Sequence, residues 1–497
     1  MPDKTSPSAT PDFSLRLCAR HLKPYLGLLL VLVIAGGLYL PMVFEWFQTD
    51  DFLFLNAFQH SNSAGYVKDA FDVRHAPPLP ELRFYRPLHS STFLALYQVL
   101  GLHAAGYHVW SLAIHLLNTC LIWLITARLT KQSLVANLAA ALFALHPAYT
   151  PAVAWISNNN ALMATAAGLI SFWCFLKSEE AGRHRYWYWA SVGSYAASLL
   201  FHPEAGTIIV ALMACRLLFD MKDWREALSW RRWLDLGPFL LVAAGYLAIH
   251  RWMVSQDFLP QAQNFQITHH MIRVYLGYLA LCIYPNSSTQ QLALTSRGAD
   301  AAAAGMVVVM GLLLYVGVAR GRRTAALAAV WLLAALVPLS TVAVPFGGDV
   351  FGRKLYVAGP ALALALALLL APAVEALERS AGKAGQAALV AGCVAILSLV
   401  GWRIVLYQNQ VGTAARQSRS LIVELRRTYP DIQPGTRLFL LDAPPFTFPF
   451  IPIYPQAMIG LYYNDVDVIP TSEGDLPQLH PGDLVFRYRP SKAASPP

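Results

Sequence analysis

Long apolar stretches, separated by short polar segments, dominate the hydropathy pattern of this chain. A helix needs about 20 apolar residues to cross the hydrocarbon core of a bilayer, and many of these stretches approach that length. The pattern predicts membrane spans near 26–43, 107–126, 133–147, 160–176, 186–201, 204–219, 234–252, 302–318, 325–342, 355–371 and 386–406. The expected fold class is a polytopic α-helical membrane protein with about eleven transmembrane helices.

Composition supports this prediction and excludes other classes of protein. Of the 497 residues, 56% are hydrophobic and only 13% are charged, and the mean hydropathy is +0.44. A soluble domain carries about 25% charged residues. No basic run with interleaved aromatic residues occurs, so we expect the lipid bilayer as a partner and no nucleic acid.

The distribution of Lys and Arg predicts the orientation. These residues follow the even-numbered spans, so the positive-inside rule places the N-terminal segment 1–25 in the cytoplasm. The loops 44–106 and 253–301 are then extracytoplasmic. The apolar stretch 271–285 would reverse all later charges if it crossed the membrane, so we expect it to lie on or dip into the outer membrane surface. The amphipathic segment 88–100 is predicted to be a similar helix.

The chain changes character after the last span. The segment 407–497 is rich in Pro, Asp and Arg, and 437–442 and 483–488 are typical of short strands between turns. We therefore predict three units: the N-terminal segment, a transmembrane domain over 26–406, and a small extracytoplasmic α+β domain over 407–497.

An acidic pair, Asp50-Asp51, follows the first span. Two adjacent carboxylates near lipid are costly, which favours a catalytic base with a supporting partner or a metal ligand. A helix start is the alternative, because Asp is common at N-caps. Arg86 before Pro87 also has two interpretations: its side chain extends to the membrane surface, or its guanidinium binds a phosphate.

Histidines accompany these residues at the predicted extracytoplasmic face. His108 and His115 lie on one face of the second span, where hydrogen bonds between helices are the favoured role and ligand binding is the alternative. His146 ends the third span, and His202 and Glu204 lie in a tight extracytoplasmic turn. Capping or breaking a helix is the simpler role for these three. Their spacing matches no metal motif.

Two cations, Arg353 and Lys354, precede the tenth span on the face where the positive-inside rule disfavours them. They are expected to bind an anion, either the phosphate of a lipid carrier or a membrane headgroup.

These motifs resemble, in their order along the chain, the GT-C superfamily of polyprenyl-phosphate-sugar glycosyltransferases. The similarity is greatest to protein O-mannosyltransferases of the branch that carries tetratricopeptide repeats, although the repeats are absent here, and it covers roughly residues 26–371. The matching elements are the acidic pair, Arg86-Pro-Leu, Tyr107-His108-x6-His115, Ala-Leu-His146-Pro, Ala-Trp155-Ile-Ser157, Pro-Glu204 and Gly-Arg353-x-x-Tyr356.

The resemblance implies a sugar transfer from a polyprenyl-phosphate donor, with inversion, to a protein Ser/Thr or an envelope glycan or lipid. It implies that Asp50 is the base and that Asp51 supports it or holds a divalent cation; no cofactor is otherwise expected. The donor phosphate or other substrate groups would contact residues drawn from Arg86, His108, His115, His146, Asn159, His202, Glu204, Arg353, Lys354 and Tyr356. The expected location is a bacterial-type inner membrane.

One departure from the family pattern affects the donor site. The related transferases carry an Arg and an Asp where this chain has Asn159 and Ala161. A transporter or flippase for a lipid-linked sugar and a GT-C scaffold without activity therefore remain alternatives. The charges collect at one membrane face, however, whereas transporters tend to place them at the midplane of broken helices.

Overall fold

Helices make up most of the computed structural model. The structure describes residues 12–79, 83–180, 185–220, 233–259, 269–282, 297–319, 322–340, 349–380, 382–442, 446–447, 451–452 and 454–488. The predicted loop 253–301 therefore lies partly outside the described residues.

Each predicted span coincides with a helix. The helices are α1 (Asp12–Tyr39), α5 (Ala104–Thr130), α6 (Ser133–Ala144), α8 (Asn159–Ser178), α9 (Arg185–Phe201), α10 (Ile208–Cys215), α13 (Gly237–Ser255), α16 (Arg297–Ala319), α17 (Arg323–Ser340), α18 (Gly359–Ser380) and α19 (Gly382–Thr428). Within the described residues, six helices are long and apolar enough to cross a membrane, or seven if α6 and its bent continuation form one span. The polytopic α-helical fold class is confirmed.

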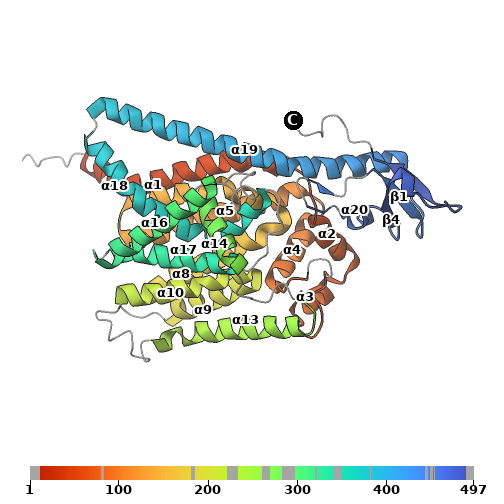
Figure 1. Ribbon diagram of the computed structural model, residues 1–497, viewed down its shortest axis with the longest axis horizontal. Coiled ribbons are helices and arrows are strands. Elements are labelled where there is room, and N and C mark those ends of the chain that lie inside the picture. Colours follow the sequence, from red (N-terminus) through yellow and green to blue (C-terminus); the bar gives the residue numbers. More distant parts are fainter. Residues whose placement is uncertain are drawn as a thin grey trace, which may run out of the picture.

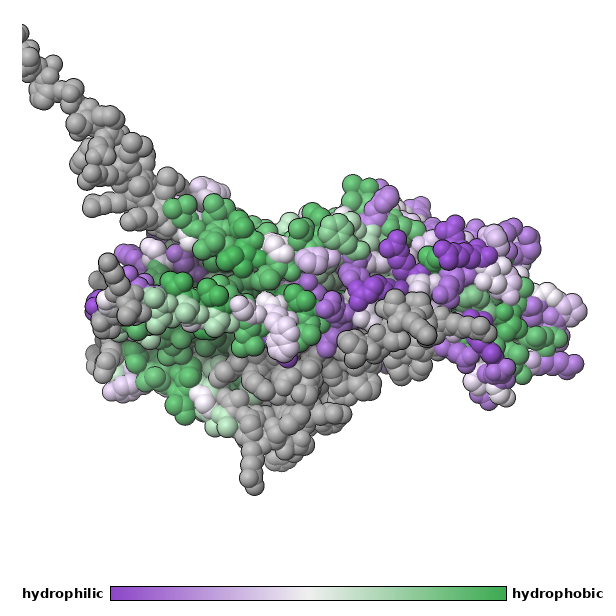
Figure 2. All heavy atoms as spheres, turned by 90° about the horizontal axis from the view of Figure 1, so that it is seen from above, coloured by the Kyte–Doolittle hydropathy of each residue, from purple (hydrophilic) through white to green (hydrophobic). Residues whose placement is uncertain are grey.

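The apolar helices form one bundle, and α19 runs along its edge beside α1 (Figure 1). The small sheet lies beyond one end of the bundle. Hydrophobic residues cover much of the bundle surface, whereas hydrophilic residues gather toward the end that carries the sheet (Figure 2). This division is the one expected of a protein whose bundle faces lipid and whose other end faces water.

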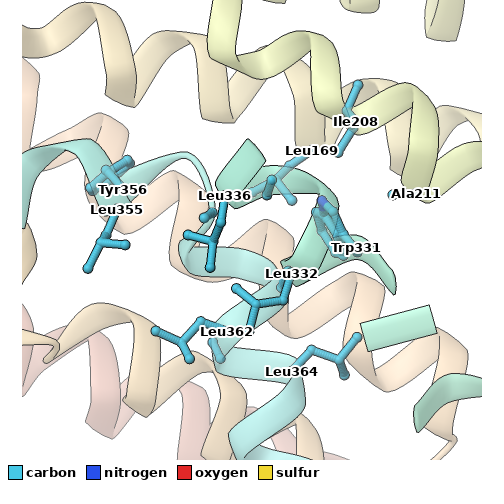
Figure 3. Packing of buried hydrophobic residues seen from close by; sticks show 14 of the residues in the cluster. Leu169, Ile208, Ala211, Trp331, Leu332, Leu336, Leu355, Tyr356, Leu362 and Leu364 are labelled. Atoms are coloured by element: carbon cyan, nitrogen blue, oxygen red, sulfur yellow. The ribbon is translucent and has the colours of Figure 1, made fainter. Parts of the chain in front are cut away.

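The bundle interior is filled by closely packed side chains. Leu169 of α8, Ile208 of α10, Trp331 of α17 and Leu362 of α18 belong to one buried cluster (Figure 3). The same cluster includes Tyr356 from the 3-10 segment η8 (Asp349–Tyr356). The segment that carries Arg353 and Lys354 is therefore anchored in the bundle core.

Shorter elements connect or extend the bundle helices. They are the helices α2 (Asp51–His60), α3 (Ser63–Phe71), α4 (Pro87–Leu100), α7 (Thr150–Ala154) and α14 (His269–Leu281), the 3-10 segments η1 (Leu40–Phe44), η2 (Pro147–Tyr149), η3 (Ile156–Asn158), η4 (Pro203–Thr207) and η6 (Leu234–Leu236), and the π-helical η5 (Arg216–Asp220). The predicted helices over 88–100 and 271–285 correspond to α4 and α14. The last residues of 271–285 lie outside the described part.

The C-terminal strands and helix form a small α/β unit. Its elements are β1 (Arg437–Leu441), β2 (Phe446–Thr447), β3 (Ile451–Pro452), α20 (Pro455–Gly460), β4 (Asp467–Thr471), η9 (Glu473–Asp475) and β5 (Leu484–Arg487). β1 lies between β4 and β5 and is parallel to both, and β2 pairs with β3. The strands expected at 437–442 and 483–488 are confirmed.

This unit shares a hydrophobic core with the loop after the first span. Phe54 of α2 and Phe93 of α4 belong to the same buried cluster as Leu425 of α19, Leu438 of β1 and Met458 of α20. Helix α19 continues through residue 406, where we predicted a domain boundary, because Leu425 and its neighbours stay buried beyond the span.

Candidate active site

A polar pocket lies where α2, α4, α8, η4 and η8 meet. Its empty space, counted together with the solvent at its mouth, is about 840 Å³. The charged and titratable side chains that line it come from segments far apart in the sequence: Asp50, Arg86, His89, His202, Glu204, Arg353 and Lys354. The structure therefore brings together most of the predicted charged candidates.

Asp50 lies at the turn that precedes α2. Thr49 adopts a left-handed backbone conformation (φ 49°), and its hydroxyl donates to Asp50 Oδ1 at 2.8 Å. Asp50 is the N-cap residue, but its side chain makes no capping bond. One carboxylate oxygen therefore has its position fixed by Thr49, while the side chain lines the pocket.

Asp51 has a different environment from its neighbour. It is fully buried, and its two carboxylate oxygens accept N–H groups from Gln48 at 2.9 Å and from Ser157 at 2.7 Å. Asp51 thus ties the loop after α1 to η3, far along the sequence. Burial and the adjacent charge of Asp50 raise its pKa to about 8, against the opposing effect of these two N–H donors. Burial also raises the pKa of Asp50, and the nearby charge of Arg353 opposes that rise.

Replacement of Asp51 by Asn should lower stability, because one amide oxygen cannot accept from both N–H groups. An unpaired buried N–H costs about 1–3 kcal/mol. The pKa of Asp51 rises from 3.8 to about 8 on folding. The contribution of protonated Asp51 to the free energy of unfolding is therefore complete below pH 3.8 and is lost as the pH rises toward 8. The stability gap between wild type and Asp51→Asn should therefore narrow from pH 5 to pH 8. Thermal unfolding in detergent measures the gap, and a gap that widens would contradict this account.

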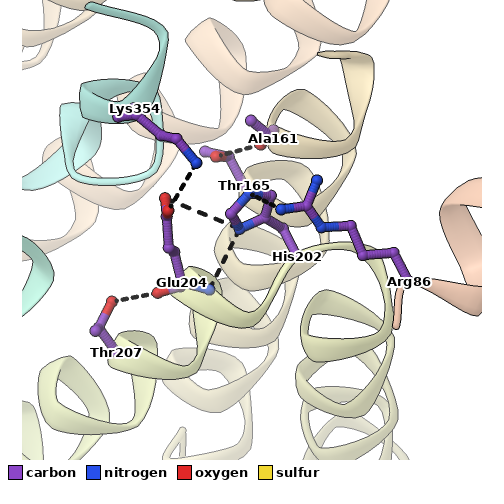
Figure 4. Close-up of polar contacts among 7 residues, drawn as sticks. All are labelled: Arg86, Ala161, Thr165, His202, Glu204, Thr207 and Lys354. Atoms are coloured by element: carbon purple, nitrogen blue, oxygen red, sulfur yellow. Dashed lines mark hydrogen bonds and ion pairs between the residues drawn. The ribbon is translucent and has the colours of Figure 1, made fainter. Parts of the chain in front are cut away.

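A network of polar side chains forms one wall of the pocket (Figure 4). Pro87 begins α4 and leaves Arg86 as the preceding residue, whose guanidinium lies 3.0 Å from His202 Nε2. Pro203 begins η4 after His202, and Glu204 follows. Lys354 Nζ reaches Glu204 Oε1 at 3.4 Å.

His202 is held as a neutral imidazole by this network. Because a guanidinium can only donate, His202 Nε2 accepts the hydrogen bond from Arg86. The other ring nitrogen, Nδ1, lies 3.3 Å from the backbone N–H donor of Glu204 and 3.8 Å from the carboxylate of the same residue. Burial and the nearby cations lower the pKa of His202 well below its ordinary value. His202 therefore positions Arg86 and adds no charge.

Arg353 lies over the ring of Trp155, 4.3 Å from the ring centre. Its Nε is buried and has no hydrogen-bond partner among the described residues. The stack fixes the plane of the guanidinium at the pocket wall. Arg353 thus offers a buried donor that no described protein group satisfies, which is the condition expected at a ligand site.

The pocket has an excess of positive charge. Arg86, Arg353 and Lys354 face the carboxylates of Asp50 and Glu204, which leaves a net charge of +1 when both carboxylates are ionised. Burial lowers the pKa of Arg86 to about 10 and also lowers the pKa values of Arg353 and Lys354. A bound anion would relieve this cost.

Asparagines line the pocket at the start of α8. Asn158 and Asn160 contribute to its surface and keep buried amide atoms without a hydrogen-bond partner in the described part of the chain. Asn159, the predicted candidate, is buried between them and is not a lining residue. Ala161, at the position where the family has Asp, does line the pocket. This wall can therefore hydrogen-bond a ligand without adding charge.

Besides Asp51 and Asn159, the structure places four further predicted candidates away from the pocket lining. Tyr356 donates its hydroxyl to His115 Nδ1 at 2.8 Å, and His115 Nε2 donates to the carbonyl of Ala144 at 3.1 Å. His146 stacks on Tyr149, with ring centres 4.7 Å apart, and His108 is buried in α5. The contacts of His115 and Tyr356 join helices within the bundle, which is the interhelical role considered for His115.

Sequence reasoning missed His89, which follows Arg86 by three residues and lines the same pocket. Burial and Arg86 lower its pKa to about 3, so this ring is neutral. Phe84 was also missed; its ring lies 4.3 Å from the Arg86 guanidinium. The helical spacing from Arg86 to His89 was the available signal.

No metal site is evident from these side chains. Within the described ranges, no group of three or more His, Cys, Asp or Glu residues is placed to hold a metal ion. The divalent cation at Asp51 remains a prediction.

Parts of the chain are similar in sequence to known proteins. No protein-family model matches it. Protein O-mannosyl-transferase Tmtc3 of Drosophila melanogaster is 27% identical over 167 residues, which is 28% of this chain and 18% of that protein. Protein O-mannosyl-transferase TMTC2 of Mus musculus is 29% identical over 133 residues, 26% of this chain and 16% of that protein. The chain resembles the protein O-mannosyltransferases. This confirms the resemblance stated from the motifs, over less than a fifth of the length of either relative.

Two solved membrane enzymes also align with the structure. ArnT from Cupriavidus metallidurans, bound to undecaprenyl phosphate, aligns with a TM-score of 0.47 and 14% identity over 90% of this chain and 86% of that chain. The oligosaccharyltransferase of Archaeoglobus fulgidus aligns with a TM-score of 0.48 and 11% identity over 84% of this chain and 62% of that chain.

Proposed function

We propose that this protein is a membrane glycosyltransferase that moves a sugar from a polyprenyl-phosphate carrier to an acceptor hydroxyl. One observation carries the proposal: a single pocket is lined by the carboxylate of Asp50 and by the guanidinium groups of Arg86 and Arg353, whose charges interact with that carboxylate. A sugar joined to a phosphate needs this combination, because a base must act on one side of the anomeric carbon and cations on the other.

The reaction would be a single displacement with inversion. Asp50 takes the proton of the acceptor hydroxyl as its oxygen bonds to the anomeric carbon. The bond from that carbon to the carrier phosphate breaks, and its electron pair leaves with the phosphate. Arg86 and Arg353 stabilise the developing negative charge, and Lys354 adds to the field while it stays paired with Glu204. The phosphate leaves as a stable anion, so no acid is required.

The acceptor would be a protein Ser/Thr or an envelope glycan or lipid. The charge distribution of the sequence favours an extracytoplasmic pocket. The proposed location is a bacterial-type inner membrane. The neutral amides of Asn158 and Asn160 would contact sugar hydroxyls. This wall supports a donor with a neutral sugar more than one with a charged sugar.

Transfer from a polyprenyl-phosphate sugar by the purified protein tests the proposal directly. Arg353→Ala is expected to weaken donor affinity about tenfold to hundredfold, since a hydrogen bond to a charged group contributes about 1.5–3 kcal/mol. Donor-dependent thermal stabilisation measures affinity separately from turnover. Arg379→Ala, at the exposed end of α18, is the matched control. Donor affinity equal to that of wild type would remove Arg353 from the phosphate site, and binding without transfer by wild type would contradict the catalytic proposal.

A further inference from the structure

A second groove, which we call the α19 groove, lies where α19 leaves the bundle. Its empty space is about 560 Å³, and it shares no lining residue with the polar pocket. It is formed by the chain after the first span, one face of α19 and the chain after α20. Its lining residues are Trp46, Arg419, Ile422, Val423, Arg426 and Tyr462.

The groove begins close to the membrane boundary. The first apolar helix ends at Phe44, whose side chain is 78% exposed and faces lipid or the interface. The next residue, Glu45, forms an ion pair with Arg416 of α19. Arg416 therefore marks the level at which the first span ends. At 1.5 Å per residue, Arg419 lies about 4.5 Å beyond that level and Arg426 about 15 Å beyond it.

These distances along α19 show where the groove lies relative to the lipid headgroups. The headgroup layer adds about 5–8 Å to each side of the hydrocarbon core, so Arg419 lies at headgroup depth. Helical Cα–Cβ bonds tilt toward the helix N-terminus, which is the membrane end of α19. The long side chain of Arg426 can therefore extend back toward the headgroups. Trp46, just after the span, is a residue type typical of this interface.

The two arginines are available to an anion. No carboxylate in the described part of the chain forms an ion pair with Arg419 or Arg426, whereas Arg416, Arg437 and Arg487 all have such partners. Arg426 instead lies 5.3 Å from the centre of the Tyr462 ring. Ile422 and Val423 give the groove an apolar floor between the cations. A phosphate joined to an apolar body matches both features.

We propose that the α19 groove binds an anionic membrane phospholipid. Arg419 and Arg426 hold the phosphate of its headgroup, while Trp46, next to the end of the first span, contacts its glycerol and acyl end. A lipid held here would fix the C-terminal unit against the membrane surface, because Tyr462 belongs to that unit and Trp46 follows the first span. This site is independent of the sugar-transfer reaction.

Native mass spectrometry of the full-length protein with phosphatidylglycerol or phosphatidylcholine of equal chain length tests this proposal. The double variant Arg419→Gln/Arg426→Gln is expected to bind phosphatidylglycerol about thirtyfold more weakly, since each of the two cations near an anionic membrane surface contributes about 1 kcal/mol. Its binding of phosphatidylcholine should not change. Arg427→Gln is the matched control, because Arg427 is exposed on the same helix and does not line the groove.

Three results would overturn the proposal. The first is equal phosphatidylglycerol binding by wild type and the double variant. The second is an equal loss of both lipids in that variant, which would show that charge is not recognised. The third is displacement of phosphatidylglycerol by inorganic phosphate at the same concentration as the lipid. This would show that the groove binds an anion and does not recognise the glycerol or acyl part of a lipid. Arg419→Lys/Arg426→Lys keeps both charges and should retain phosphatidylglycerol binding, which separates loss of charge from misfolding.

Discussion

Asp50→Asn is expected to reduce sugar transfer by about 10²–10⁴-fold, the usual contribution of a general base. The amide has nearly the same shape as the carboxylate and can still accept the hydrogen bond from Thr49. The variant should therefore fold, and it loses only the group that takes the acceptor proton. Initial rates with a labelled polyprenyl-phosphate sugar, measured in membranes or detergent, give the effect.

The affinity for donor gives this prediction a second readout. Removal of the Asp50 charge raises the net charge of the pocket from +1 to +2, so donor phosphate should bind at least as tightly as in wild type. Asp69→Asn, on the exposed face of α3 in the same loop, controls for the loss of one carboxylate. Turnover like that of wild type in Asp50→Asn would exclude Asp50 as the base.

Glu204→Gln is expected to destabilise the protein by about 3–5 kcal/mol, the cost of breaking a buried ion pair from one side. Glu204 is only 7% exposed, and it neutralises Lys354 while its carboxylate faces the Nδ1 side of His202. The variant leaves Arg86, Arg353 and Lys354 with Asp50 as their nearest countercharge in the pocket. Denaturant or thermal unfolding in detergent measures the loss.

An added anion should partly restore this variant. Because the pocket of Glu204→Gln has excess positive charge, polyprenyl phosphate should stabilise it more than it stabilises wild type. Glu375→Gln removes an exposed ion pair with Arg379 and should cost no more than about 1 kcal/mol. Two results would show that Glu204 does not balance the pocket charge. One is a loss of stability in Glu204→Gln of no more than about 1 kcal/mol, and the other is equal stabilisation of this variant and of wild type by polyprenyl phosphate.

Apolar length was enough to predict the helices of the bundle, because each span must satisfy its own backbone within lipid. It did not predict where α19 ends. The sequence becomes polar after residue 406, yet Ala414, Leu421 and Leu425 remain buried and the helix continues to Thr428. This extension depends on packing against the C-terminal unit, which a local hydropathy pattern does not contain.

The sequence was enough to predict which charged residues lie at the site, but not which of them contact one another. Arg86, Glu204 and Lys354 could be assigned to one membrane face, but their network joins residues more than a hundred positions apart. The bond from Ser157 N–H to Asp51 is equally long-range. His108 shares the expected face and still lies outside the pocket lining, because the rotation of α5 in the bundle decides which side chains reach it.

The shared core of α2 and the C-terminal unit has a consequence for biosynthesis. Gln59 of α2 donates to the carbonyl of Leu461, which follows it by 402 residues. At about 5–20 residues per second, a ribosome makes these two residues roughly 20–80 s apart. Helix α2 therefore leaves the ribosome long before its packing partner exists. A nascent chain with its spans already inserted would still have the side of α2 that packs against the C-terminal unit uncovered until the last segment is translated.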